Sequence, residues 1–145
     1  MTMSDFSSHD IMIASTDDPN RVVQADSKGN LALWKLLEDS DRQRFVLTKT
    51  ESRLWTISSV SGGVRIATKG EAGPLVLSAS STSETEWFLE FEGELDYGKP
   101  VRFRSRTPDN HYMTVHGNAD GTGEIRATAP NNYGQLWTLR QPKTL

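Results

Sequence analysis

The sequence predicts an all-β fold built from three repeats of four short strands each. The first observation is a five-residue motif that occurs three times, at 43–47, 85–89 and 135–139. Each copy begins with Gln or Thr and ends with an aromatic residue, one spacer and a leucine. The aromatics at positions 45, 87 and 137 lie 42 and 50 residues apart, which suits repeated supersecondary units. The second observation is that apolar residues alternate over about 4 to 6 positions between Gly, Pro, Asn and Asp, as in half-buried antiparallel strands.

The elements of each repeat follow the same order. The first strand is an alternating apolar stretch that ends in serine, at 11–15, 55–59 and 101–105. A polar or glycine-containing turn leads to the second strand, at 21–25, 64–67 and 112–115. A glycine-bearing turn, a third strand, a polar loop and the motif complete the repeat. The leucine-rich segment 31–37 is the best helical candidate, but Gly29 and Asn30 precede it and polar residues follow it, so most of it is predicted to be a strand.

Two of the three motifs resemble the Q-x-W repeat of ricin-B-type β-trefoil lectins. The resemblance rests on LALW at 31–34 followed by Gln43-x-Phe45, and on YGQLWTL at 133–139. As a pattern it covers essentially the whole chain, and small single-domain fungal trefoil lectins are the nearest in length. It implies a β-trefoil with pseudo-three-fold symmetry in a single domain, 1–145, with repeats at approximately 9–51, 52–97 and 98–145. Fascin-like actin-bundling modules, Kunitz-type inhibitors and fungal cysteine-protease inhibitors share the same pattern.

The resemblance implies a sugar site in the first repeat. In ricin-type repeats an acidic residue after the second strand, an aromatic on the third strand and an Asn or Gln near the motif contact the sugar. Trp34 matches the aromatic and Gln43 matches the motif glutamine. The acidic position holds Gln24, with Asp26 two residues later, and this departure argues against galactose recognition of the ricin kind.

The other two repeats match the ricin-type site less well. In the second repeat Thr85 replaces the motif glutamine and segment 75–78 carries no aromatic, so a purely structural role is predicted. The last repeat keeps Gln135, but its aligned acidic and stacking positions hold Thr114 and Arg126. Its remaining candidates for sugar contact are polar or aromatic residues in loops, namely Asn118, Asp120, Asn131, Asn132 and Tyr133.

The same residues also have a structural interpretation. The recurring aromatics Phe45, Trp87 and Trp137 are predicted to anchor the core. Trp34 lacks an aromatic equivalent in the other repeats and is therefore the tryptophan most expected to be exposed. The motif glutamines either contact a ligand or satisfy buried backbone groups, and the sequence leaves both roles open.

Composition and charge argue against several functions. The 145 residues include 16 basic and 19 acidic side chains, giving a net charge of −3 with no basic run, so no nucleic-acid partner is predicted. Arg102, Arg104 and Arg106 share one strand face and are expected to be countered by nearby carboxylates. The chain has no cysteine, no signal-like N-terminus and no apolar stretch near the ~20 residues that span a bilayer. We therefore expect a cytoplasmic protein, or one exported without a signal peptide, that does not insert into membranes.

The sequence predicts no enzyme activity, no metal site and no cofactor. The three histidines lack the spacing of metal ligands. Segment 118–124 imitates the start of a calcium loop, but Ala129 stands where a bidentate glutamate is required. Pairs of carboxylates lie in polar loops, where solvation keeps them ionised and unsuited to acid catalysis.

A non-catalytic carbohydrate-binding protein, a lectin, is therefore the first hypothesis, with glycans or glycoproteins as partners. A sugar presents an apolar face and a fringe of hydroxyls, which an exposed aromatic and short polar side chains complement. One alternative is a protease inhibitor that acts through the loop at 17–20 or at 108–110. A further alternative is a fascin-like actin-binding module, which would need a homodimer to present the two binding faces that bundling requires.

Overall fold

The computed structural model describes residues 10–37, 40–50, 53–60, 63–69, 73–80, 82–117, 123–130 and 134–142. These residues form twelve strands and confirm the predicted all-β class, with four strands in each repeat. The first repeat contains β1 (Asp10–Ser15), β2 (Arg21–Ala25), β3 (Leu31–Lys35) and β4 (Phe45–Lys49). The second contains β5 (Trp55–Ser59), β6 (Arg65–Ala67), β7 (Val76–Ser78) and β8 (Trp87–Glu90). The third contains β9 (Pro100–Ser105), β10 (Tyr112–Gly117), β11 (Gly123–Thr128) and β12 (Trp137–Arg140).

Two short 3-10 helices precede the motif strands of the first two repeats. They are η2 (Asp41–Gln43), which precedes β4, and η3 (Ser83–Thr85), which precedes β8; each is a single turn. The leucine-rich segment after Gly29 is a strand up to Lys35, as predicted. Within the described ranges, no helix has the length and apolar character needed to cross a bilayer.

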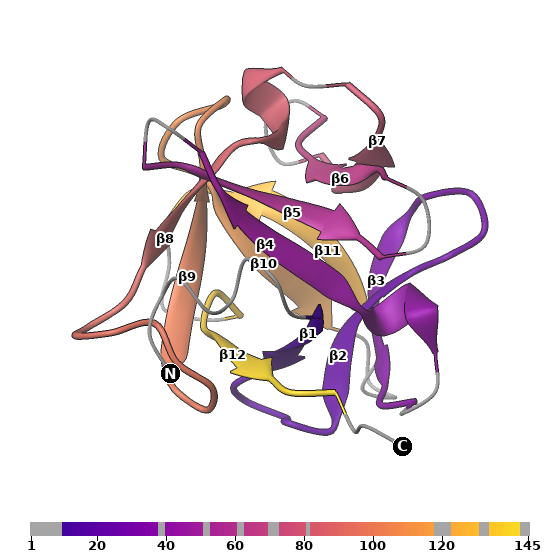
Figure 1. Ribbon diagram of the computed structural model, residues 1–145. Coiled ribbons are helices and arrows are strands. Elements are labelled where there is room, and N and C mark those ends of the chain that lie inside the picture. Colours follow the sequence, from indigo (N-terminus) through magenta and orange to yellow (C-terminus); the bar gives the residue numbers. More distant parts are fainter. Residues whose placement is uncertain are drawn as a thin grey trace.

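The first and last strands of the repeats close into a barrel. Among the described strands, β1 pairs with β4, β4 with β5, β5 with β8, β8 with β9, β9 with β12, and β12 with β1 again. Every pair is antiparallel, and Figure 1 shows β4 and β5 running across the front of this barrel. Closure removes the exposed strand edges that an open sheet would leave.

The second and third strands of each repeat form hairpins that close one end of the barrel. These hairpins are β2–β3, β6–β7 and β10–β11. They contact one another in a ring, because Leu33 of β3 pairs with Gly123, Asn30 bridges to Val76, and Pro74 bridges to Arg126. A barrel of six strands with three hairpins in this arrangement is a β-trefoil, as the repeated motif predicted.

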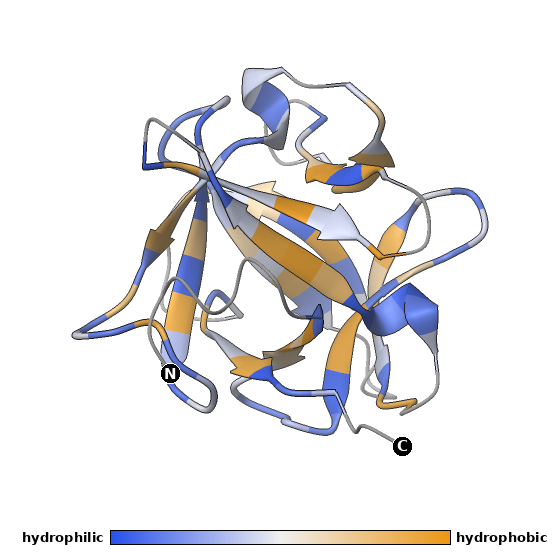
Figure 2. Cartoon of the chain, viewed as in Figure 1, coloured by the Kyte–Doolittle hydropathy of each residue, from blue (hydrophilic) through white to orange (hydrophobic). Residues whose placement is uncertain are grey.

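The core is filled from inward-facing positions of the barrel strands. Figure 2 shows hydrophobic and hydrophilic residues alternating along β9, and its inward residues Val101 and Phe103 are buried. The motif aromatics Phe45, Trp87 and Trp137 are fully buried, which confirms them as core anchors. Their equivalent places around the three-fold axis explain why the sequence repeats them.

Buried tryptophans also need a partner for the indole N–H. Trp87 Nε1 donates to the backbone carbonyl of Ile66 at 3.1 Å, and Trp137 Nε1 donates to that of Met113 at 2.9 Å. Ile66 and Met113 occupy equivalent places on β6 and β10. The motif aromatic therefore joins the barrel to the hairpin of its own repeat, in addition to filling the core.

Candidate functional site

The outer face of the β2–β3 hairpin carries an exposed tryptophan. Trp34 is 40% exposed, whereas the other three tryptophans are buried, so the expectation that Trp34 would be the exposed one is confirmed. It lies directly across from Val22, which is buried with Met12 and Ala14 in a small apolar cluster outside the main core. A half-exposed indole next to an apolar neighbour offers the flat apolar surface that can stack on a sugar ring.

Gln24 lies on the same face of the hairpin, diagonal to Trp34. It pairs with Ala32, two residues before Trp34 on β3, and it is half-buried. Diagonal neighbours on antiparallel strands have Cβ atoms about 7–8 Å apart, within reach of long side chains. The hairpin therefore places one amide beside one indole on a single face, with Gln24 where a ricin-type repeat has an acidic residue.

Gln43 is fully buried, contacts the side chain of Gln24 and binds the protein itself. Its Nε2 donates to the carbonyl of Lys35 at 2.8 Å and to Oε1 of Gln24 at 2.9 Å. Its Oε1 accepts the backbone N–H of Leu37 at 2.8 Å. Because each polar atom of the amide has an internal partner, Gln43 joins β2, η2 and the end of β3 and presents no surface to a ligand.

Gln135 has the same position and the same role in the last repeat. It is buried, and its Nε2 donates to the carbonyl of Ala129 at 2.9 Å and to Oγ1 of Thr114 at 3.1 Å. The corresponding Thr85 is also buried, and its hydroxyl donates to the carbonyl of Thr82 at 2.8 Å. Of the two roles that the sequence left open for the motif glutamines, the structure shows the internal one.

The equivalence of these hydrogen bonds corrects one alignment. Gln24 and Thr114 both accept from the motif glutamine, so they are equivalent, and their cross-strand partners are Ala32 and Arg126. Arg126 therefore corresponds to Ala32, and the place of Trp34 is taken by Thr128. The assignment of Arg126 to the stacking position was wrong because the β10–β11 ladder continues to Gly117 and Gly123, two pairs further than the β2–β3 ladder. An alignment that counts residues from the turn therefore places Arg126 at the position of Trp34, two residues away from its true equivalent.

Asp26 lies away from Trp34, at the turn of the same hairpin. The last ladder pair before the turn is three pairs from the one that contains Trp34, or about 10 Å along the strand. The Asp26 carboxylate accepts the backbone N–H groups of Lys28 at 2.8 Å and Asn30 at 2.9 Å. Asp26 thus closes the turn, and the structure does not bring it together with the tryptophan.

We expect the turn at Asp26 to weaken in acid. The hydrogen bond from the Asn30 backbone, helped by that from Lys28, lowers the pKa of Asp26 below its ordinary value of 3.8. A lowered pKa means that the ionised carboxylate contributes stability above pH 3.8, and that this contribution is lost as the pH falls through the folded-state pKa. The stability difference between the wild type and Asp26→Ala should therefore shrink as the pH falls through this window, measured by urea unfolding at several pH values. A difference that stays constant down to the lowest pH would contradict this.

The other candidates in the last repeat, Asn118, Asp120, Asn131, Asn132 and Tyr133, lie outside the described residues. The exposed loops proposed for protease inhibition are described. Residues 17–20 are exposed and are held by a hydrogen bond from the Asn20 backbone to Asp18 at 3.2 Å. In the loop at 108–110, the hydroxyl of Ser105 donates to the carbonyl of Pro108. No group of three or more potential metal ligands occurs in the described part of the chain.

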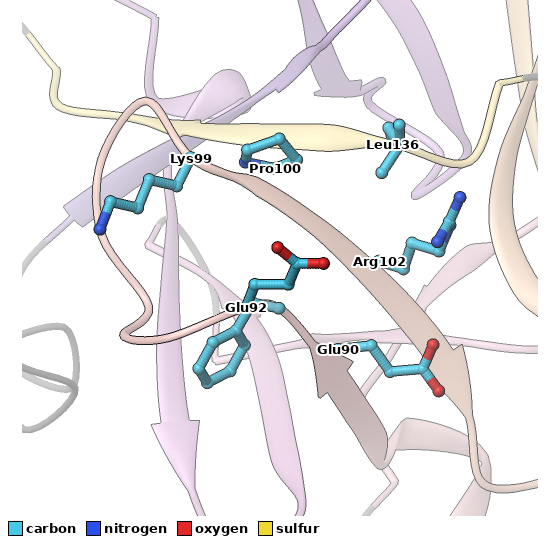
Figure 3. A pocket seen from close by; sticks show the side chains of 7 residues that line it. Glu90, Glu92, Lys99, Pro100, Arg102 and Leu136 are labelled. Carbon is cyan, nitrogen blue, oxygen red and sulfur yellow. The ribbon is translucent and has the colours of Figure 1, made fainter.

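Sequence reasoning missed a pocket on the barrel wall. It has a volume of about 580 Å³ and lies where the end of β8, the start of β9 and the residue before β12 meet (Figure 3). Its lining combines both charges with apolar groups, from Glu90, Phe91, Glu92, Lys99, Pro100, Arg102 and Leu136. The only signal in the sequence was the outward alternation of arginines on β9, because the pocket forms only when the distant Leu136 comes to lie beside residues 90–92 and 99–102.

Two arginines of the region next to this pocket pair with carboxylates. Arg106 pairs with Glu86 at 2.6 Å and Arg104 with Glu90 at 3.5 Å, as the arginine face predicted. Glu90 also accepts the Tyr112 hydroxyl at 2.8 Å; burial, together with this hydrogen bond, raises the pKa of Tyr112. Figure 3 shows the carboxylate of Glu92 directed toward Pro100 on the pocket wall. Phe91 lines the pocket but is partly buried against the core, so it presents less open aromatic surface than Trp34.

Comparison with known proteins identifies the fold. No family model matches the chain, and no curated protein matches its sequence. Solved structures do match. ThreeFoil, a designed 3-fold symmetric protein, has a TM-score of 0.78 and 11% identity over 91% of this chain and 98% of its own. A ricin B-like lectin from Macrolepiota procera, in complex with lactose, has a TM-score of 0.74 and 16% identity over 94% and 97%.

Another lectin-like neighbour and a toxin extend this comparison. SeviL bound to asialo-GM1 saccharide has a TM-score of 0.71 and 18% identity over 93% of this chain and 98% of its own. The chain also matches a mosquitocidal holotoxin with a TM-score of 0.77, of which it spans 17% of the length. At these identities the likeness concerns the fold alone: the chain is a β-trefoil, and its structural neighbours include ricin B-like lectins.

Proposed function

We propose that the protein is a non-catalytic carbohydrate-binding protein whose binding surface is the outer face of the β2–β3 hairpin. The observation that carries the proposal is the exposure of Trp34 beside the amide of Gln24, while the other three tryptophans are buried. Two structural neighbours, the Macrolepiota procera lectin and SeviL, are described with lactose and a saccharide bound, which supports the proposal by analogy of fold.

The surface suits a shallow sugar site. The apolar face of a pyranose ring stacks on the indole of Trp34, and Val22, its direct cross-strand partner, is buried on the same face of the hairpin. Gln24 supplies a polar contact on the same face, and Arg21 and Lys35 form the next cross-strand pair beyond Trp34. A site with few walls holds a single sugar weakly, so several linked sugars or several copies of the protein would raise the apparent affinity.

Replacing Trp34 with alanine should abolish most glycan binding and leave the fold intact. Loss of a stacking aromatic removes the main apolar contact, so we expect binding to fall about 10-fold or more. The measurement is a glycan array followed by calorimetric titration with the best glycan. The matched control is Leu136→Ala, because Leu136 is 38% exposed but lies at the pocket on the barrel wall.

The outcomes separate the proposal from its alternatives. Binding by the wild type and by Leu136→Ala but not by Trp34→Ala, with all three showing the same unfolding midpoint, supports the site. Equal binding by all three places the sugar elsewhere. No binding by the wild type contradicts carbohydrate recognition, and the next measurements are then a panel of papain-like and trypsin-like proteases and co-sedimentation with actin filaments.

A further inference from the structure

The orientation of the Gln43 amide follows from its backbone partners. The N–H of Leu37 can only donate, so the atom of Gln43 that it meets at 2.8 Å is Oε1. The carbonyl of Lys35 can only accept, so the atom that meets it at 2.8 Å is Nε2. Both ends of the amide are therefore assigned by groups that have a single hydrogen-bonding role.

This assignment determines how Gln24 is oriented. Gln43 Nε2 uses its second N–H toward Gln24 at 2.9 Å, so the Gln24 atom in this contact must be an acceptor, its Oε1. The Nε2 of Gln24 then points away from Gln43. Among the described residues it donates to no partner, and it is not buried from solvent. Two N–H donors of Gln24 are thus free to reach a ligand on the face that carries Trp34.

We propose that Gln24 determines ligand specificity and selects saccharides that carry an acetamido group. The inference rests on the proposed function, because it concerns the same surface. A carboxylate at this position would present only acceptors and would favour a sugar with neighbouring hydroxyl donors. The Gln24 nitrogen presents only donors, and the carbonyl oxygen of an acetamido group is a strong neutral acceptor that cannot donate.

The surroundings of Gln24 also suit the methyl of an acetamido group. The acetamido methyl is apolar, and Trp34 lies diagonal to Gln24 on the same face. A pose with the sugar ring or the methyl against the indole leaves the carbonyl directed at the amide. In the hydroxyl analogue a weaker acceptor replaces the carbonyl and the methyl contact is lost, so this analogue is expected to bind less tightly.

The test compares matched sugars with the wild type and a nearly isosteric variant. N-acetylgalactosamine and galactose, and N-acetylglucosamine and glucose, differ only in whether carbon 2 carries an acetamido group or a hydroxyl. The wild type is expected to bind the acetamido form at least 10-fold more tightly. Gln24→Glu keeps an oxygen that accepts from Gln43, so its fold should survive, but it replaces donors with acceptors. Its acetamido preference is expected to fall about 10-fold or more.

The possible results distinguish the two proposals. A wild type that binds glycans but shows no acetamido preference overturns the role of Gln24 without touching the lectin function. The same conclusion follows if Gln24→Glu folds and keeps the wild-type preference. A wild type that binds no glycan at all overturns the proposed function itself. The wild-type comparison needs no variant, so it remains decisive if Gln24→Glu does not fold.

Discussion

Replacing Trp137 with alanine is expected to lower the free energy of unfolding by about 3 to 5 kcal/mol. The side chain is fully buried among the barrel strands, so truncation removes a large apolar surface and leaves a cavity. It also leaves the carbonyl of Met113 without its donor. Urea denaturation monitored by circular dichroism measures the change, with Trp34→Ala as the exposed tryptophan for comparison.

A phenylalanine at the same position separates packing from hydrogen bonding. The first repeat shows that the trefoil accepts phenylalanine here, because Phe45 occupies the equivalent place and is fully buried. Trp137→Phe should therefore cost less than Trp137→Ala, with the lost indole hydrogen bond contributing about 1 to 3 kcal/mol. A cost for Trp137→Ala below that of Trp34→Ala would show that position 137 is not a core anchor.

Replacing Gln43 with alanine is expected to cost about 2 to 3 kcal/mol, although the residue is polar. The change removes the partner of the Leu37 N–H, the Lys35 carbonyl and the Gln24 oxygen together. A buried polar group left without a partner costs about 1 to 3 kcal/mol, and water entering at the exposed ends of β3 offsets part of the sum. The variant Arg42→Ala is the matched control, because Arg42 is an exposed neighbour in the same 3-10 turn.

Hydrogen exchange offers a local check on Gln43. The amide of Leu37 should exchange faster in Gln43→Ala than in the wild type, while amides inside the barrel follow only the global change in stability. The same variant frees the Gln24 amide to rotate, so glycan binding should weaken as well. Unchanged exchange at Leu37 together with unchanged stability would show that the buried amide network is dispensable.

The repeated motif was sufficient to predict the strands and the core. Short-range alternation and turn residues define strands locally, and an aromatic repeated at equivalent places must fill equivalent core positions in a three-fold fold. The exposure of Trp34 was inferred from its lack of an aromatic equivalent in the other repeats, although Trp55, which aligns with Ile11 and Val101, is buried. The register of the β10–β11 hairpin could not be predicted from the sequence. Its ladder extends two pairs further than the β2–β3 ladder, so Arg126 does not align with Trp34.

The sequence by itself determined the all-β trefoil, its core aromatics and the one exposed tryptophan, because these depend on period and on burial pattern within each repeat. Only the tertiary structure decided that Gln43 and Gln135 face inward, that Asp26 closes a turn away from Trp34, and that Gln24 directs donors to the surface. It also decided the pocket at Arg102, where the distant Leu136 lies beside residues 90–92 and 99–102. The physical reason is that hydrogen-bond partners and pocket walls come from residues far apart in the chain, so their direction is set when the strands pair.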